Sequence, residues 1–290
     1  MTLTPLQERL LQWHTTHTRS LPWRETRDPY AIVVSEIMLQ QTGVERVLPK
    51  YKDWLARWPT WEALAQAPLG EVVRAWEPLG YNRRAVWLHR IAQRVVQHWG
   101  GRLPQDARAL ATLPGVGPYT RNAILCFAFG HDVAVLDTNV RRVLARAILG
   151  EKDAWPSALR EVAEGLVPQG MGRTWNLALM DLGATVCVAR LPRCGICPWR
   201  DLCAWRARGM PPGSPQRRPA PFPGSPRYFR GRMLAFLRRV PTGQSVPLED
   251  LCVHIGLDTA LGYQLAHALH REGLVQVREE KGLYCISLPP

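Results

Sequence analysis

Lysine is scarce in this chain of 290 residues: only four of its 37 basic residues are lysines, and the other 33 are arginines. Long apolar runs are lacking as well, since no stretch approaches the roughly 20 apolar residues of a membrane-spanning helix. The N-terminal stretch carries Glu8 and Arg9 within its only apolar segment, which indicates an amphipathic helix and not a signal peptide. We therefore expect no membrane association and a cytoplasmic location.

Cysteine is used in a way that argues against a secreted disulfide framework. The count of seven is odd, and four of them crowd into residues 187–203 with the spacing C-x6-C-x2-C-x5-C. Such clustering favours a reducing compartment and a metal site formed by Cys187, Cys194, Cys197 and Cys203. Zinc is one candidate, but structural zinc sites usually pair two C-x2-C knuckles, and only one is present. Iron–sulfur clusters tolerate uneven spacing because each iron takes one cysteine, so we predict a [4Fe–4S] cluster.

The charge balance is strongly basic, with 37 basic against 24 acidic side chains, a formal charge of +13 and a pI near 10. This excess favours an anionic partner, with nucleic acid the first candidate. A GC-rich genome that encodes arginine in place of lysine on an ordinary surface is the alternative explanation. A bound cluster with its four thiolates would lower the charge to about +11.

The chain divides by composition near residue 210. Before it, apolar residues recur at helical spacing between glycine and proline breaks, and this predicts an all-α region. Residues 210–226 are mostly Pro, Gly and Ser and predict a linker. Residues 227–290 hold amphipathic segments followed by two alternating ones around a turn. We predict a small α+β winged-helix-like domain there, with a generic helical cap and hairpin as the alternative.

A helix–hairpin–helix signal spans residues 113–124, which read Leu-Pro-Gly-Val-Gly-Pro-Tyr-Thr-Arg-Asn-Ala-Ile. Two glycines allow a tight turn, and Pro118 suits the first position of the helix that follows. Free amides at such a turn can hold a phosphate oxygen without reading sequence. The predicted DNA-contacting residues of this motif are Gly115, Val116, Gly117 and Thr120.

Two acidic residues lie in poorly polar surroundings. Glu36 is flanked by Val33, Ile37 and Met38 in a predicted apolar helix, and Asp137 begins a helix that carries arginines. Taken alone, Glu36 would be an exposed helical glutamate and Asp137 a helix N-cap. The motifs around them favour a functional interpretation instead.

These motifs together resemble the helix–hairpin–helix DNA glycosylases with an iron–sulfur cluster, a family that includes endonuclease III and the MutY-type adenine glycosylases. In chain order over residues 6–206 they are Leu21-Pro-Trp-Arg, Asp28-Pro-Tyr, Ser35-Glu-Ile-Met-Leu-Gln-Gln-Thr, Leu79-Gly-Tyr, Leu113-Pro-Gly-Val-Gly-Pro-Tyr-Thr, Leu136-Asp-Thr-Asn-Val-Arg-Arg-Val and Met180-Asp-Leu-Gly-Ala, followed by the four cysteines. The stretch at 35–42 points to the MutY branch.

The resemblance implies an all-α, two-lobed glycosylase fold with a [4Fe–4S] loop. Its expected parts are an N-terminal helix at 1–23 packing on the Fe–S lobe, a six-helix lobe at 24–130 with the hairpin, an Fe–S lobe at 131–209, the linker at 210–226 and the winged-helix-like domain at 227–290.

The resemblance also implies a monofunctional enzyme of base excision repair that flips out adenine mispaired with 8-oxoguanine or guanine and hydrolyses its glycosidic bond. Glu36 takes the role of the acid that protonates adenine, and we expect burial to raise its carboxyl pKa. Asp137, with Asn139 beside it, is expected to stay ionised at a helix N-terminus and to stabilise the sugar cation or bond to it. Relatives that also cut the strand carry a lysine where this chain has Tyr119, which we expect to pack against the sugar or to hydrogen-bond Asp137.

Further contacts follow from the same resemblance. Gln40 and Tyr81 are expected to wedge into the base stack, with Gln41 also on the DNA. A helix-surface glutamine and a core tyrosine are the structural alternatives for the two wedges. The residues expected to line the adenine pocket are Trp23, Arg24, Leu39 and Leu177.

Three departures from the family pattern bear on specificity. Thr138 stands where the motif usually has glycine, and Leu177 replaces a Glu or Gln that contacts the adenine amino group. The tail is too short for the nucleotide-hydrolase-like domain with which longer relatives recognise oxidised guanine. A mismatch thymine/uracil glycosylase is therefore the first alternative, and a non-enzymatic, redox-sensing DNA-binding protein is the second.

The expected partner is double-stranded DNA that contains a mismatch. The 210–226 linker is a candidate contact for a sliding clamp or another repair protein. We further expect a monomer that works in a bacterial cytoplasm, associated with the nucleoid.

Overall fold

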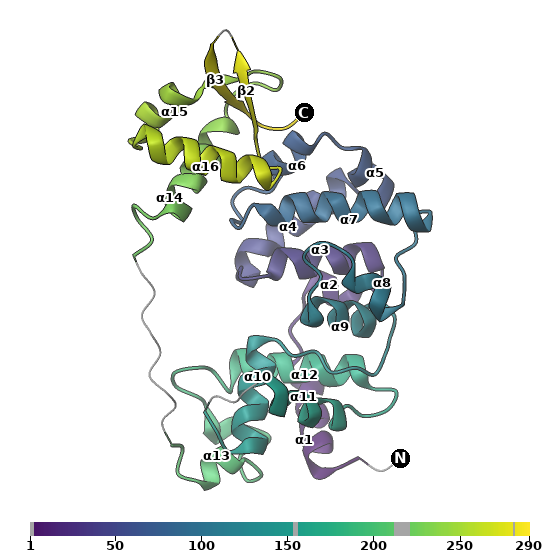
Figure 1. The fold of residues 1–290 in the computed structure, drawn as a ribbon. Helices are drawn as coiled ribbons and strands as arrows, with labels where there is room; N and C mark the ends of the chain where they lie inside the picture. The colour runs from purple at the N-terminus through teal and green to yellow at the C-terminus, as the bar shows by residue number, and fades with distance from the viewer. Residues whose placement is uncertain (1–2, 153–155, 212–220, 281) are drawn as a thin grey trace. The chain divides into compact units, whose positions relative to one another are not determined.

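The computed structural model describes residues 3–152, 156–211, 221–280 and 282–290. It is mainly helical, as the sequence predicts, with a small sheet in its C-terminal part (Figure 1). The chain divides into two compact units, which are described separately. Residues 1–33, 105–112 and 116–217 form the first unit, and residues 34–104, 113–115 and 218–290 form the second. None of the described helices is long and apolar enough to cross a membrane.

The first unit is built from helices alone in its described residues. They are α1 (Pro5–His17), α2 (Pro22–Glu25), α8 (Ala107–Ala111), α9 (Pro118–Phe127), α10 (Thr138–Leu144), the π-helical turn η1 (Ala145–Leu149), α11 (Pro156–Gly165), α12 (Gly172–Thr185), the short 3-10 turn η2 (Cys194–Ile196) and α13 (Ala204–Ala207). The helix α3 (Pro29–Leu39) begins in this unit and ends in the second.

The helix α1 begins where the sequence supplies a capping box. Thr4 accepts a hydrogen bond from the amide of Gln7, and the Gln7 side chain accepts one from the amide of Thr4. The apolar face of α1 buries Leu10 in the core of the first unit, together with Trp175 of α12. The indole of Trp199 donates to the carbonyl of Leu6 at 2.8 Å. The helix α1 thus packs in the unit that carries the four clustered cysteines.

A buried ionic network closes the other end of α1. Asp181 on α12 has no exposed surface and accepts hydrogen bonds from both terminal nitrogens of Arg24, at 2.7 and 2.9 Å. His14 lies 3.2 Å from the same carboxylate, and Arg19 also donates to it. Sequence reasoning missed this network, because its partners lie more than 150 residues apart along the chain.

The second unit joins the middle of the chain to its C-terminal part. Its elements are α4 (Val44–Arg57), α5 (Trp61–Gln66), α6 (Leu69–Ala75), α7 (Arg83–Trp99), α14 (Pro226–Leu237), β1 (Val246–Pro247), α15 (Leu248–Ile255), α16 (Thr259–Arg271), β2 (Gln276–Glu280) and β3 (Leu283–Ser287).

The C-terminal residues pack directly on α6 and α7. Val73 of α6 and Val86 of α7 belong to the same buried core as Leu234 of α14 and Leu251 of α15. Arg238 donates to the side-chain oxygen of Asn82 at 2.8 Å and to the carbonyl of Val73 at 3.1 Å. The sequence suggests a separate C-terminal domain, and the structure instead places residues 218–290 in one compact unit with residues 34–104.

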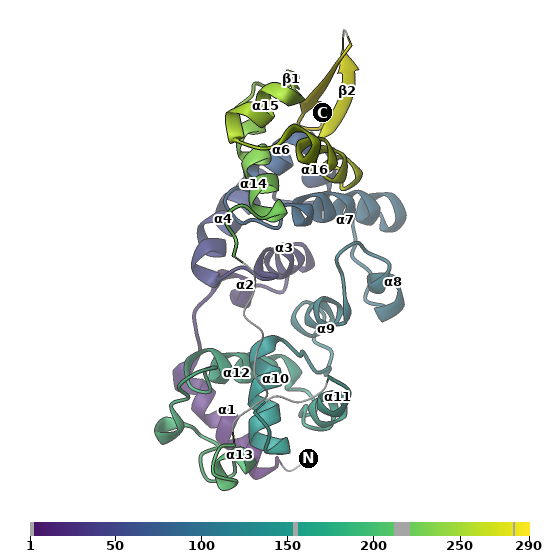
Figure 2. The ribbon, with the colours of Figure 1, turned by 60° about the vertical axis from the view of Figure 1, so that its left-hand side comes forward.

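The C-terminal elements follow the order α14, β1, α15, α16, β2, β3. The sheet is antiparallel with strand order β1-β3-β2, and Val277 of β2 pairs with Ile286 of β3. Figure 2 shows β1 and β2 together with α15 and α16. The amphipathic segments predicted from the sequence correspond to α14 and α16, and the two alternating segments correspond to β2 and β3. Sequence reasoning misses α15 and the two-residue β1, which are too short to stand out as periodic segments. Of the predicted 210–226 linker, residues 212–220 lie outside the described residues.

Candidate functional site

Glu36 lies on α3, whose apolar sequence folds as a helix that is buried along most of its length. Every residue from Tyr30 to Met38 is buried, and Glu36 is only 5% exposed. Val33 and Ile37, one on either side of it along the helix, are fully enclosed. The alternative of an exposed helical glutamate is therefore wrong. Apolar surroundings of this kind favour the neutral form of a carboxyl group.

Asp137 belongs to the first unit, where it is the N-cap of α10. Its carboxylate accepts hydrogen bonds from the amide of Val140 at 2.6 Å and from Nδ2 of Asn139 at 3.2 Å. Burial raises the pKa of Asp137 above its ordinary value, while these hydrogen bonds and the nearby Arg142 oppose the rise without cancelling it. Asp137 is thus a helix cap and a desolvated carboxyl group at once, and desolvation outweighs the help that the helix N-terminus gives the ionised form.

A chain of hydrogen bonds joins Asp137 to the cysteine segment. The side-chain oxygen of Asn139 accepts from Arg142 at 2.8 Å, and Arg142 donates to the carbonyls of Gly183 and Cys187, both at 2.7 Å. A Cβ on Gly183 would lie 2.7 Å from the Cβ of Asn139, so this glycine makes room for the chain. The arrangement gives a physical reason for the glycine in the Met180-Asp-Leu-Gly-Ala motif.

Arg24 is held in place by a buried ion pair. Both of its terminal nitrogens donate to Asp181, and its main-chain carbonyl accepts a hydrogen bond from Arg173 at 2.7 Å. These contacts tie the segment after α1 to α12, and the predicted place of Arg24 at the adenine pocket stays a prediction.

The other predicted pocket residues differ in burial. Trp23 is buried, while Leu177 and Tyr119 are half-buried against the core of the first unit. Leu39 is half-buried and belongs to the second unit. Their predicted contacts with a base, and the predicted contact between Tyr119 and Asp137, stay predictions.

The glycine turn of the hairpin has the predicted geometry. Gly115 has a φ of +75°, and a Cβ there would lie 2.4 Å from the ring of Trp87. Gly117 is the N-cap of α9, and Pro118 occupies its first turn as predicted. Val116 and Thr120 are buried, in contrast to the exposed Gly117, so a DNA contact from these two would have to come from the main chain.

Two predicted DNA-contacting residues have strained backbones. Gln41 and Tyr81 have φ values of 56° and 45°, and the only other described non-glycine residue with a positive φ is Met210. Such conformations are costly for residues with a Cβ and cluster at functional sites. Tyr81 is 44% exposed, so the alternative of a core tyrosine is wrong. Gln40 is half-buried and donates to the carbonyl of Gly115 at 3.1 Å, which ties the end of α3 to the hairpin turn.

Arg84 donates to main-chain carbonyls at or next to these two strained positions, those of Tyr81 at 3.3 Å and Gln40 at 2.5 Å, and sequence reasoning missed it. It is only 3% exposed and donates to the carbonyls of Ile37 and Met38 at the end of α3, at 3.0 and 2.7 Å. It also donates to the carbonyl of Gly80 at 2.9 Å. Burial lowers the pKa of Arg84 to about 10, and the coulombic interaction with Tyr81 offsets part of this effect. No local sequence signal distinguishes Arg84 from Arg83, since only the tertiary contacts separate them.

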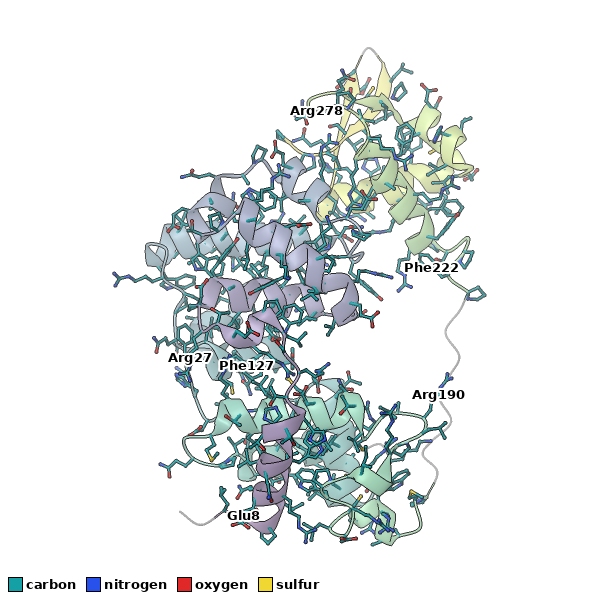
Figure 3. The ribbon with its side chains drawn as sticks, turned by 180° about the vertical axis from the view of Figure 1, so that it is seen from behind. Glu8, Arg27, Phe127, Arg190, Phe222 and Arg278 are labelled. Carbon is teal, nitrogen blue, oxygen red and sulfur yellow. The ribbon has the colours of Figure 1, made fainter. Side chains whose placement is uncertain are left out.

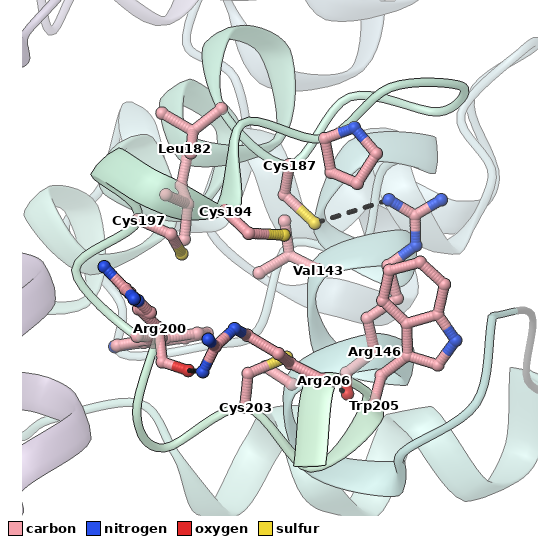
Figure 4. A pocket seen from close by; sticks show the side chains of 14 residues that line it. Val143, Arg146, Leu182, Cys187, Cys194, Cys197, Arg200, Cys203, Trp205 and Arg206 are labelled. Atoms are coloured by element: carbon pink, nitrogen blue, oxygen red, sulfur yellow. Dashed lines mark hydrogen bonds between the residues drawn. The ribbon is translucent and has the colours of Figure 1, made fainter. Parts of the chain in front are cut away.

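The four clustered cysteines face a common cavity (Figure 4). Arg146 borders this cavity. Its Nη1 atom lies 3.6 Å from Sγ of Cys187 and donates to the carbonyl of Val188 at 2.8 Å. Burial, together with the neighbouring cysteines, raises the pKa of Cys197 to about 11, although a hydrogen bond with the backbone of Trp199 opposes the rise. Metal coordination deprotonates such thiols outright.

The donor set of this cavity fits an iron–sulfur cluster. Besides the four cysteines, its described lining is apolar or cationic and contains no carboxylate or imidazole. Among the described residues, no three His, Cys, Asp or Glu side chains form a group suited to a single metal ion. Thiols that surround a shared space, with a guanidinium at its edge, suit an anionic cluster in which each iron takes one sulfur.

Comparison with known proteins agrees with this geometry. Residues 34–169 match the model of the HhH-GPD superfamily base excision DNA repair proteins, and residues 187–203 match the iron–sulfur binding domain of endonuclease III. An adenine DNA glycosylase from Mycobacterium tuberculosis is 49% identical over 79% of this chain and 77% of its own length.

Two solved structures are similar as well. A thermostable thymine-DNA glycosylase has a TM-score of 0.66 at 36% identity and covers 70% of this chain and 95% of its own. An endonuclease III–DNA covalent intermediate has a TM-score of 0.62 at 23% identity, covers 72% and 100%, and shows the shared fold.

Proposed function

Because this chain belongs to the HhH-GPD superfamily of base excision DNA repair proteins, we propose that it is a DNA glycosylase that releases adenine mispaired with guanine or 8-oxoguanine. The observation that carries the proposal is a buried Glu36 and a half-buried, desolvated Asp137 at the two motif positions where the chemistry needs carboxyl groups. The similarity to an adenine glycosylase supports adenine as the base.

Adenine leaves a sugar slowly unless one of its ring nitrogens first takes a proton. A duplex also hides the base, so the nucleotide must be extruded before either carboxyl group can act. We assign the proton to Glu36, which lies buried on α3 between apolar side chains. Protonation draws the electron pair of the C1′–N9 bond onto the base, and that bond breaks.

Bond cleavage leaves positive charge on the sugar, which Asp137 stabilises in its ionised form or bonds to transiently. The hydrogen bonds from Asn139 and the amide of Val140 orient this carboxylate. Water then adds to C1′ and gives up a proton, and the products are free adenine and an abasic site. Two carboxyl groups with different environments thus divide the acid and the stabilising roles.

The segment 187–203 binds an iron–sulfur cluster, and Cys187, Cys194, Cys197 and Cys203 are its ligands. When bound, a [4Fe–4S] cluster supplies a redox-active, anionic centre that cross-links four points of the segment. Arg142 and Arg146 hold the main-chain carbonyls of residues 187–189 beside it.

The chain offers no lysine where strand-cutting relatives carry one, so we propose a monofunctional glycosylase. Tyr119 occupies that position and packs half-buried against the core. We further propose a monomer that binds mismatched duplex DNA, works in a bacterial cytoplasm near the nucleoid and uses the 210–226 segment to contact a sliding clamp or repair protein.

A mismatch thymine/uracil glycosylase is the second candidate, and two observations favour it. The solved thymine-DNA glycosylase is 36% identical to this chain, and Leu177 cannot accept a hydrogen bond from the adenine amino group. A non-enzymatic, redox-sensing DNA-binding protein would leave the buried Glu36 and the desolvated Asp137 without a purpose.

A base-release assay over a panel of duplexes separates these candidates. Adenine should be released from A:8-oxoguanine and A:G duplexes, while T:G and U:G duplexes stay intact. The reverse pattern would establish the thymine/uracil glycosylase. No release from any duplex by protein with its cluster bound would contradict both.

A further inference from the structure

A large groove opens in the second unit where α14 faces the loop between α6 and α7. We call it the α14 groove. Its cavity volume is about 560 Å³. This volume lies within the roughly 300–1,000 Å³ range of binding pockets, so the side chains that line the groove, and not its size, indicate what it binds. Its lining residues are Gln40, Gln41, Arg46, Leu79, Gly80, Tyr81, Asn82, Arg83, Arg84, Trp87, Phe222, Arg227, Arg230, Gly231, Leu234, Leu269, Glu272 and Leu274.

The charge of the α14 groove is one-sided. Five arginines line it against a single acidic residue, Glu272, which pairs with Arg230 at 2.6 Å. Arg84 is buried in its carbonyl contacts, which leaves Arg46, Arg83 and Arg227 exposed on the groove. Three exposed guanidinium groups that line one groove are suited to binding the oxygens of phosphate groups.

Aromatic rings stand beside these cations. Tyr81 is 44% exposed. Phe222, which lies just before α14 in the sequence, is 49% exposed (Figure 3). The guanidinium carbon of Arg227 lies 5.4 Å from the ring centre of Tyr81 and 5.0 Å from that of Phe222. Arg83 lies over Trp87 in the same way, at 5.2 Å. Exposed rings interleaved with arginines are typical of surfaces that stack unpaired bases while holding the backbone.

Arg227 is also the direct link between the C-terminal part and the predicted wedge. It donates a hydrogen bond to the hydroxyl of Tyr81 at 3.0 Å. Tyr81 has a φ of 45°, and the exposed Gln41 in the same groove has a φ of 56°. A strained, exposed tyrosine gains a defined orientation from a cation that contacts both its ring and its hydroxyl.

We propose that the α14 groove binds one strand of the duplex, with its phosphates on Arg46, Arg83 and Arg227 and an unstacked base against Tyr81 or Phe222. Arg227 acts as the positioning residue of Tyr81. The C-terminal elements are then part of the DNA-binding surface. The proposal rests on the proposed DNA glycosylase function and deepens it by assigning a DNA-contacting role to residues 222–274.

The first test compares Arg227→Ala with Arg239→Ala. Both remove one exposed positive charge, but Arg239 does not line the groove. The dissociation constant of a fluorescent duplex carrying an abasic-site analogue is measured at several salt concentrations. Loss of a phosphate contact in Arg227→Ala should reduce the slope of log affinity against log salt by about 0.9, and Arg239→Ala should leave the slope unchanged. Equal slopes for both variants and the wild type would overturn the proposal.

The second test is a double-mutant cycle between Arg227→Ala and Tyr81→Phe. The phenylalanine variant keeps the ring and removes only the hydroxyl that accepts from Arg227. If Arg227 acts through Tyr81, the losses of affinity, each about tenfold or less, should not add in the double variant. Full additivity would refute the positioning role. If Arg227→Ala folds poorly, Tyr81→Phe alone still tests the hydrogen bond, because it removes a single atom: wild-type affinity in Tyr81→Phe would count against the positioning role.

Measuring DNA binding and base release together distinguishes failure of the groove proposal from failure of the proposed glycosylase function. If the wild type releases the base but Arg227→Ala binds DNA as the wild type does, the groove proposal is refuted and the glycosylase function stands. If Arg227→Ala binds DNA differently but the wild type releases no base, the groove proposal is supported and the glycosylase function is refuted.

Discussion

Asp137 has a structural role and a chemical role, and the two favour different protonation states of its carboxyl group. It caps α10, which stabilises the fold, but its burial disfavours the ionised form that the reaction needs. Folding therefore raises the pKa of Asp137 above its value in the unfolded chain. For an acid this means that its contribution to stability is greatest at low pH and is lost as pH rises through the raised pKa.

The Asp137→Asn variant tests this conflict. Asparagine caps a helix as well as aspartate does, and it carries no charge to desolvate. We expect its thermal midpoint at pH 7.5 to equal or exceed that of the wild type, with the difference narrowing as pH falls. Base release should drop by about 100- to 1,000-fold, because the sugar cation loses its counter-charge. Near-normal release would contradict the role of Asp137, and a lower midpoint would contradict the argument from burial.

Asp181 shows the opposite balance. Burial raises its pKa, but hydrogen bonds from His14, Arg24 and Arg19 outweigh that effect and hold the pKa well below the ordinary range. Its stabilising contribution is therefore complete above the unfolded value of about 3.8 and is lost as pH falls through the depressed pKa.

Removal of this charge should destabilise the fold strongly. Asp181→Asn leaves two arginines without their buried counter-ion, and we expect a loss of about 3–5 kcal/mol in the free energy of unfolding. Urea unfolding at pH 7 measures it. The matched control is Asp201→Asn, whose exposed contact with Arg200 spans 4.0 Å and should cost less than about 0.5 kcal/mol. Equal effects of the two substitutions would show that the buried network is not stabilising.

At the residue scale, the sequence predicted candidate functional residues better than it predicted which residues contact one another. It named Glu36 and Asp137 from their motifs, because each stands out as an acid among apolar neighbours. It could not show that Arg24 binds Asp181 or that Arg84 holds the end of α3. Those partners are distant in sequence, and one arginine looks like another until the chain is folded.

At the scale of elements, the hairpin depends on a glycine for a reason that can be separated from DNA binding. Gly115 has a positive φ, and the space above its Cα is filled by Trp87. Gly117, two residues later, has a φ of −82° and no atom within 4 Å of a would-be Cβ.

The two glycines therefore predict different responses to alanine. Gly115→Ala should lose about 1–3 kcal/mol of stability through backbone strain and the clash with Trp87. Gly117→Ala should keep the wild-type stability to within about 0.5 kcal/mol. Thermal or urea unfolding of both variants measures the difference. A stable Gly115→Ala variant would mean that the turn tolerates a side chain and that Trp87 moves aside.

The sequence predicted most elements but placed the short ones poorly. Helical periodicity and glycine–proline breaks indicated the helices, and the alternation after residue 273 indicated the hairpin. The eight-residue α15 and the two-residue β1 were missed, because pairing with β3 and packing in the C-terminal core define them more than their own sequence does.

At the scale of the whole molecule, the separate C-terminal domain was the main expectation that the structure changed. The apolar faces of α6 and α7 show that something must cover them, but their sequence does not say what. In the structure, α14, α15 and α16 share a buried core with them, and the C-terminal part joins residues 34–104 in one compact unit. Part of the excess positive charge also lies at a defined site, since three exposed arginines line the α14 groove.

The scarcity of lysine leads us to predict that the chain lacks strand-cleaving lyase activity. Strand cleavage by this family's lyase chemistry needs an amine that forms a Schiff base, and Tyr119 offers none. Borohydride treatment of the protein with its abasic product should therefore trap no covalent protein–DNA adduct. A trapped adduct, or strand cleavage without alkali or heat, would contradict the monofunctional assignment.

The central claim is that Glu36 is the acid that protonates the departing base. Single-turnover release of free adenine from an A:8-oxoguanine duplex tests it in the wild type, in Glu36→Gln and in the control Glu45→Gln, which alters an exposed glutamate on α4. We expect Glu36→Gln to bind the duplex with wild-type affinity but to release adenine about 100- to 10,000-fold more slowly. Glu45→Gln should match the wild type. Release by Glu36→Gln within twofold of the wild-type rate would contradict the account.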